Sequence, residues 1–156
     1  MSNSVTHEAA AKTAIAAAMA VVGNYIDGFN TRDTEKMADA FNFPHVRLAK
    51  GNFITIDNAT TLIASQQKVT HLLRDEGWTH TVIESMHAVQ SNHEKVHLAI
   101  HFTRRAADEA VLHAFDTLWI VTCSTDVSGA NPHWGVQFRS SYLVSNASTL
   151  GNSTPS

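Results

Sequence analysis

The chain has 156 residues, which suits one domain with a single hydrophobic core. Its 11 Lys and Arg residues against 14 Asp and Glu residues give a net charge of −3, which excludes a broad nucleic-acid or acidic-membrane surface. The lone cysteine, Cys123, excludes an internal disulfide and a cysteine-cluster metal site, and we expect the protein in the reducing cytoplasm. We find no run of about 18 apolar residues and expect no membrane span.

The chain begins with a pattern typical of a long amphipathic helix, from about residue 5 to residue 30. Five apolar residues recur at steps of 4, 3, 4 and 3 and share one helix face: Ile15, Met19, Val22, Ile26 and Phe29. Asp33 is placed to cap a second, short helix, which Pro44 prevents from continuing.

Two short strands, 45–49 and 52–56, are predicted next. A third helix is expected to begin at Asp57 or Asn58 and to close at Gly77. Four strand-like runs follow at 78–90, 95–104, 111–123 and 133–144, and their short polar links predict antiparallel neighbours. Residues 145–156 are mostly Ser, Asn and Thr, which indicates a disordered tail after a single domain at 1–144.

The last three strands each alternate between two kinds of side chain. We expect one face to be apolar and to pack on the long helix: Leu98, Ile100, Phe102, Leu118, Ile120, Trp134, Val136 and Phe138. The opposite face mixes aromatic and polar groups: His97, His101, His113, Phe115, Thr117, Trp119, Gln137 and Arg139. Aromatic residues on an outer sheet face favour a homodimer through that face.

Asp116 stands alone within the alternating apolar row that runs from Leu112 to Ile120. A buried carboxylate must find a partner or keep its proton with a raised pKa. The sequence offers Arg104, Ser140 or a backbone N–H as partners. A perturbed acid inside a cavity is also a common part of a binding or catalytic site, so both readings stay open.

The order of these elements resembles the nuclear-transport-factor-2-like (NTF2-like) superfamily, which includes ketosteroid isomerases, SnoaL-type cyclases, limonene epoxide hydrolases and scytalone dehydratases. The segment 21–33, VVGNYIDGFNTRD, is similar to the first-helix signature of the superfamily, and 43–48 and 139–142 resemble a bacterial subgroup. The resemblance implies an α+β cone-shaped barrel, with three helices on a curved, mostly antiparallel sheet of about six strands.

The same resemblance implies a candidate site. Tyr25 and Asp116 match the tyrosine and the protonated aspartic acid that form the oxyanion hole of the isomerases. The general-base aspartate of the isomerases corresponds here to Leu48 or Ala49, neither of which takes a proton. His45 or His80 is therefore the candidate for proton transfer in an isomerase, cyclase or dehydratase that forms an enolate-like intermediate.

The expected ligand is a small hydrophobic molecule in an apolar pocket. The residues predicted to line it are Arg104, Phe102, Leu118, Trp134, Phe138 and Tyr142. We expect no cofactor, because the nucleotide-binding glycine motifs are absent, and no metal, because histidines four apart on a strand lie about 13 Å apart. The alternative is a non-catalytic module for ligand binding or dimerisation, which the missing base favours.

Overall fold

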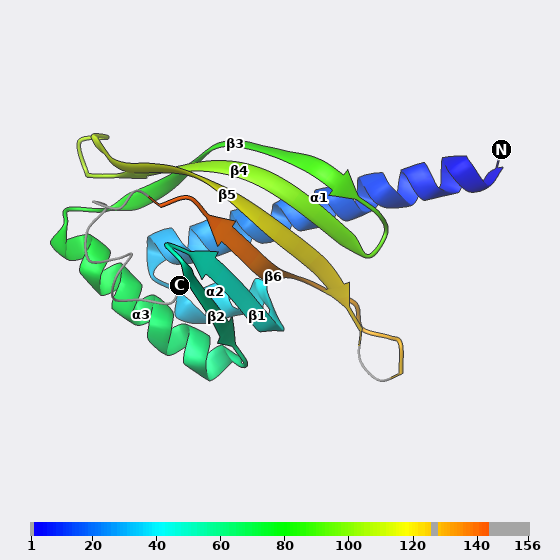
Figure 1. The fold of residues 1–156 in the computed structure, drawn as a ribbon, viewed down its shortest axis with the longest axis horizontal. Coiled ribbons are helices and arrows are strands. Elements are labelled where there is room, and N and C mark those ends of the chain that lie inside the picture. The colour runs from blue at the N-terminus through cyan, green and yellow to red at the C-terminus, as the bar shows by residue number, and fades with distance from the viewer. Residues whose placement is uncertain (1, 126–127, 144–156) are drawn as a thin grey trace.

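The computed structural model describes residues 2–125 and 128–143 of the chain. Three helices and six strands follow one another as α1 (Ser2–Thr31), α2 (Thr34–Asp39), β1 (Phe41–Ala49), β2 (Asn52–Ile56), α3 (Ala59–Asp75), β3 (His80–Ser91), β4 (Lys95–Arg105), β5 (Val111–Ser124) and β6 (His133–Ser141) (Figure 1). The predicted fold class and order of elements are confirmed. The predicted tail, 145–156, lies outside the described residues.

The two shorter helices begin at residues whose side chains cap them. Asp33 Oδ1 accepts a hydrogen bond from the Lys36 N–H at 3.1 Å at the start of α2. Asn58 Oδ1 accepts one from the Thr61 N–H at 2.9 Å, so Asn58 rather than Asp57 caps α3. Gly77 follows α3 with a φ of +97°, a left-handed conformation that glycine adopts at little cost.

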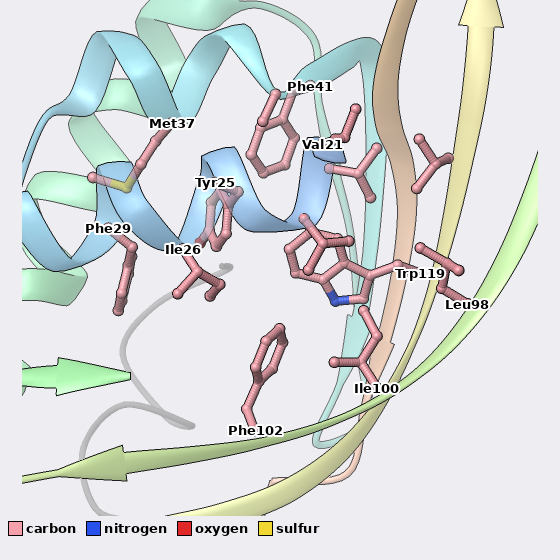
Figure 2. Packing of buried hydrophobic residues seen from close by; sticks show 14 of the residues in the cluster. Val21, Tyr25, Ile26, Phe29, Met37, Phe41, Leu98, Ile100, Phe102 and Trp119 are labelled. Carbon is pink, nitrogen blue, oxygen red and sulfur yellow. The ribbon is translucent and has the colours of Figure 1, made fainter. Parts of the chain in front are cut away.

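The six strands form one open, curved sheet in the order β2-β1-β6-β5-β4-β3. β1 and β6 pair in parallel, and the other four pairs are antiparallel. α1 crosses one face of this sheet and packs on β3, β4, β5 and β6, whereas α3 lies beside the sheet (Figure 1). The core forms between α1 and the concave face, where Tyr25 and Ile26 point toward Trp119 and Phe102 (Figure 2).

The assignment of β5 residues to the two faces was wrong. Phe115, Thr117, Trp119 and Val121 are buried toward α1, whereas Asp116, Leu118 and Ile120 belong to the other row and point to the outer face. Both rows of β5 are apolar enough to be buried. The row with Phe115 and Trp119 removes more apolar surface from water, and those residues form the core.

β6 departs from simple alternation at a bulge. The register with β5 shifts between the pairs Ile120–Phe138 and Val121–Val136. Val136 and Arg139, three residues apart, are therefore both buried, and Phe138 faces outward beside Ile120. This reverses the predicted faces of Phe138 and Arg139.

The hydropathy of α1 differs from the expectation that no segment could span a membrane. Its segment His7–Thr31 is long and apolar enough to cross a membrane, judged by length and composition. Ala14, Ala18 and Val22 on this segment are buried in the core. We therefore assign α1 to the core of the domain.

Candidate functional site

A cavity lies between α1, α3 and the concave face of the sheet. Its empty volume is about 420 Å³ with the open mouth included, of which about 30 Å³ can hold the centre of a water molecule. Aromatic and cationic side chains dominate its lining: Tyr25, Ile26, Phe29, Arg47, Gln66, Val69, Thr81, Phe102, Arg104, Phe115, Trp119, Arg139 and Ser141.

Three buried arginines face this cavity from separate strands. Arg47 on β1, Arg104 on β4 and Arg139 on β6 have exposed fractions of 5%, 8% and 3%. Burial lowers the pKa of all three guanidinium groups, well below the usual range for Arg47 and to about 10 for Arg104. Among the described residues, no Asp or Glu side chain lines the cavity to balance them.

Several hydrogen-bond donors at the cavity are buried without a partner. They are Nε and Nη1 of Arg104, Nη2 of Arg139 and Nε2 of Gln66. A buried donor without an acceptor costs roughly 1–3 kcal/mol, and more when it is charged. Such groups are retained in a fold when something else, such as a ligand, satisfies them. These four donor atoms are therefore available to an acceptor atom that enters the cavity.

Tyr25 on α1 connects α3 to the cavity through its side chain. Its hydroxyl donates a hydrogen bond to Gln66 Oε1 at 3.1 Å, which leaves the Gln66 amide nitrogen free to donate. Its ring packs edge-on against Trp119, with ring centroids 5.2 Å apart. Tyr25 thus lines the cavity, and its neighbours there differ from those expected.

His45 is fully buried and fixes the orientation of Arg139. The Arg139 Nε–H donates to His45 Nε2 at 2.9 Å, and His45 Nδ1 lies 3.2 Å from the Val136 carbonyl oxygen. The ring must be neutral, with its proton on Nδ1, to make both bonds. Burial and the positive charge of Arg139 lower its pKa to about 2.

This environment contradicts the role of proton acceptor that was expected for His45. Its lone pair already accepts from Arg139, and its N–H already donates to the backbone. His80, the other candidate, lies outside the cavity lining, with Nε2 at 3.1 Å from Glu109 and Nδ1 at 2.8 Å from Thr79 Oγ1.

Arg47 is held by a chain of hydroxyl groups. Its Nη1 donates to Ser141 Oγ at 3.0 Å. Thr117 Oγ1 donates to the Ser140 carbonyl oxygen at 3.0 Å and lies 2.8 Å from Ser141 Oγ, so the Ser141 hydroxyl donates to Thr117. The chain orients Arg47 without neutralising its charge.

Asp116 does not meet Tyr25. Its side chain is 76% exposed on the outer face, where Oδ1 accepts from His101 Nδ1 at 2.7 Å. The expected burial of Asp116 in an apolar row was wrong, because that row faces outward. The predicted oxyanion pair of a tyrosine and a protonated aspartic acid is therefore not formed in this structure.

The residues predicted to line the pocket divide between the two faces. Phe102 and Arg104 line the cavity. Leu118 and Tyr142 border a hollow on the outer face, Phe138 pairs with Ile120 there, and Trp134 lies beside α1 and α2 at another hollow. These four do not contact the cavity. In the described part of the chain, no three His, Cys, Asp or Glu side chains are grouped to hold a metal ion.

Arg47, Gln66 and Arg139 are among the cavity residues that were not predicted, and the first two left a signal in the sequence. Arg47 shares the face of His45, two residues away on β1. Gln66 stands within the apolar face of α3 formed by Leu62, Val69 and Leu73, the same kind of anomaly that drew attention to Asp116. Arg139 was hidden by the bulge in β6.

Comparisons with known proteins agree with this fold. The sequence profile of a family described as NTF2-like protein (DUF6841) matches residues 16–127. An NTF2-like protein with a cystatin-like fold from Novosphingobium aromaticivorans gives a TM-score of 0.61 at 12% identity, over 85% of this chain and 82% of that one. A ketosteroid isomerase-like protein from Erwinia carotovora atroseptica gives 0.56 at 17% identity, over 84% and 96%.

A eukaryotic protein shares the same fold. Yeast UBP3-associated protein BRE5 gives a TM-score of 0.61 at 11% identity, over 83% of this chain and 95% of that one. Identities this low show the fold and carry no activity. No protein of curated function matches the sequence. The predicted resemblance to the NTF2-like superfamily is confirmed.

Proposed function

We propose that this chain, which belongs to the NTF2-like family DUF6841, binds a small organic anion in the cavity lined by Arg47, Arg104 and Arg139. The observation that carries the proposal is the set of buried donors without acceptors on Arg104, Arg139 and Gln66. A carboxylate, which offers two oxygens and a negative charge, supplies what these groups lack.

The energetics favour a functional reason for the three arginines. A buried charge is expensive unless it is paired, and replacing buried charges by apolar residues commonly stabilises a fold. The hydroxyl chain and His45 orient two of the guanidinium groups but leave their charge uncompensated. A bound anion would provide that compensation in a medium where electrostatic attraction is strong.

The rest of the cavity indicates an apolar body for the ligand. Phe29, Phe102, Phe115 and Trp119 supply aromatic wall, and these residues suit a flat or hydrocarbon group. We therefore keep the expectation of a small hydrophobic ligand from the sequence, and we add an acidic group to that ligand.

Binding without catalysis is the reading that the cavity favours. Its described lining residues include no carboxylate or histidine to take a proton from a carbon acid. The enolate chemistry of an isomerase, cyclase or dehydratase needs such a base. The alternative expected from the sequence, a ligand-binding module, therefore becomes the main proposal, in the cytoplasm as the lone Cys123 suggests.

A homodimer through the outer sheet face is a second part of the proposal. Leu118, Ile120 and Phe138 form neighbouring apolar positions on that face, and Tyr142 beside them is 74% exposed. The apolar centre and polar surroundings of this face, with His101 and Asp116 nearby, are typical of a protein interface.

Anion binding is tested by comparing benzoate with benzamide, its neutral analogue of similar shape, at constant ionic strength. Benzoate should raise the unfolding temperature in a saturable way, and benzamide should not. Arg139→Met should remove the response to benzoate, whereas Arg74→Met, a change on the exposed face of α3, should keep it. Equal responses to the two compounds, or no response to either, would contradict the proposal.

A further inference from the structure

The three cavity arginines leave the sheet at two separate places, which form the two ends of the cavity, and their guanidinium groups lie close enough for Arg139 to lower the pKa of Arg104. Arg47 and Arg139 are direct partners in the β1–β6 register and form one end. Arg139 is opposite Trp119 on β5, and Arg104 is opposite His113 on the same strand. His113 and Trp119 lie six residues apart (119 − 113), which corresponds to roughly 20 Å of strand before the long side chains lean into the cavity.

An unbroken row of rings connects the two cationic ends. The Arg139 guanidinium lies 5.8 Å from the Trp119 ring, and the Arg104 guanidinium lies 4.8 Å from the Phe115 ring. Phe102 bridges the two, with its centroid 5.8 Å from both Trp119 and Phe115. The order along the cavity is therefore a cation, three aromatic rings and a second cation.

Each end keeps open donors of its own. Arg139 Nη2 is unpartnered at one end, and Nε and Nη1 of Arg104 are unpartnered at the other. Glu76 lies near Arg104 and opposes the effect of burial on its pKa. Glu76 Oε1 pairs with His113 Nε2 at 3.4 Å and Glu76 Oε2 is buried without a partner, so neither oxygen accepts from the two Arg104 donors.

We infer that the ligand carries two acidic groups at opposite ends of a short aromatic or apolar body. This inference rests on the proposed anion binding and adds the number and spacing of the acidic groups. One acid would accept from Arg139 and Arg47, the other would accept from Arg104, and the body would lie along the row of rings. A ligand with a single acid satisfies only one end.

Isothermal titration calorimetry with matched benzene acids distinguishes a ligand that has acids at both ends from a ligand that has one acid. Terephthalate and 1,4-phenylenediacetate carry acids at both ends, at two lengths. Monomethyl terephthalate keeps the shape but has one acid, and phthalate has both acids at one end. The better of the two para diacids should bind at least ten-fold more tightly than the monoester and phthalate.

Substitution of one cationic end provides a matched control. Arg104→Met should reduce the affinity for the para diacid to that of the monoester, whereas Arg74→Met should leave both affinities unchanged. Equal binding of monoester and para diacids by the unmodified protein would overturn this inference and leave anion binding intact. Failure of all four acids to bind would overturn both. The comparison of ligands on the unmodified chain needs no variant to fold.

Discussion

Arg139 donates its Nε–H to Nε2 of His45 across 2.9 Å, between two side chains that are 3% and 0% exposed. A histidine that accepts from a guanidinium must be neutral, and the Val136 carbonyl fixes its other nitrogen as the donor. The imidazole therefore acts as a positioning group for a buried cation. Arg139 in turn lines the cavity, and its Nη2 atom has no partner.

Replacing His45 should disturb Arg139 and the fold together. In His45→Ala, Arg139 Nε loses its acceptor and the Val136 carbonyl loses its donor, so we expect a loss of about 2 kcal/mol in the free energy of unfolding. Benzoate affinity should fall as well. His45→Gln keeps an acceptor and a donor on one side chain and should recover part of both. Urea unfolding and calorimetry measure the two effects, and full benzoate affinity in His45→Ala would rule out the positioning role.

Stability should decline in mild acid because His45 is held neutral. Burial and Arg139 lower its folded pKa from the usual 6.5 to about 2, so between these values the unfolded chain binds a proton that the folded chain does not. The contribution of His45 is fully present above pH 6.5 and is lost as the pH falls from 6.5 toward 2. For one proton the slope reaches about 1.4 kcal/mol per pH unit.

The pH dependence is assigned to His45 by comparison with His45→Gln. Urea midpoints measured between pH 7.5 and 4.5 should fall more steeply for the unmodified chain than for the variant. His113, whose pKa burial also lowers, contributes to the slope that both proteins share. Identical slopes in the two proteins would contradict the neutral state of His45.

Arg104→Met should make the ligand-free protein more stable while it weakens ligand binding. The substitution removes a buried cation that has two unpartnered donors and only the nearby Glu76 as an opposite charge, and it leaves a flexible apolar side chain of similar length. We expect a gain on the order of 1 kcal/mol in the free energy of unfolding. Urea unfolding of Arg104→Met and of the surface control Arg74→Met checks this. A clear loss of stability in Arg104→Met alone would show that Arg104 supports the fold rather than a ligand.

The fold was predictable from the sequence because its signals are local. The helical period from Ile15 to Phe29 and the capping residues Asp33 and Asn58 each depend on neighbours a few residues away. Short polar links between the later strands gave the antiparallel meander in the same way.

The site was harder to predict because it depends on which face of each strand is buried. Both rows of β5 are apolar, and only packing against α1 determines that Trp119 rather than Leu118 is buried. The β6 bulge, which brings Arg139 inside, leaves no clear mark in the sequence. Asp116, the anomaly that first indicated a site, belongs to the outer face, and the buried polar residue with the same kind of signal was Gln66.

We expect a homodimer through the outer sheet face, and we expect one added charge on that face to disrupt it. Leu118→Glu places a carboxylate among Ile120, Phe138 and Asp116, where it adds repulsion and desolvation cost to an interface. Val111→Glu, at the exposed start of β5, serves as the control. Sedimentation should show a dimer for the parent chain and for Val111→Glu and a monomer for Leu118→Glu. A monomeric parent chain would refute the predicted dimer.

The arginine side chains themselves report most directly on ligand binding. The Nε–H signals of Arg104 and Arg139 in ¹H–¹⁵N spectra, assigned with Arg→Lys variants, can be followed while benzoate is added. Anion binding in the cavity predicts saturable shifts of at least one of these signals, with the Arg74 signal unchanged at constant ionic strength. Signals of Arg104 and Arg139 that stay in place, or that move together with Arg74, would contradict the proposed function.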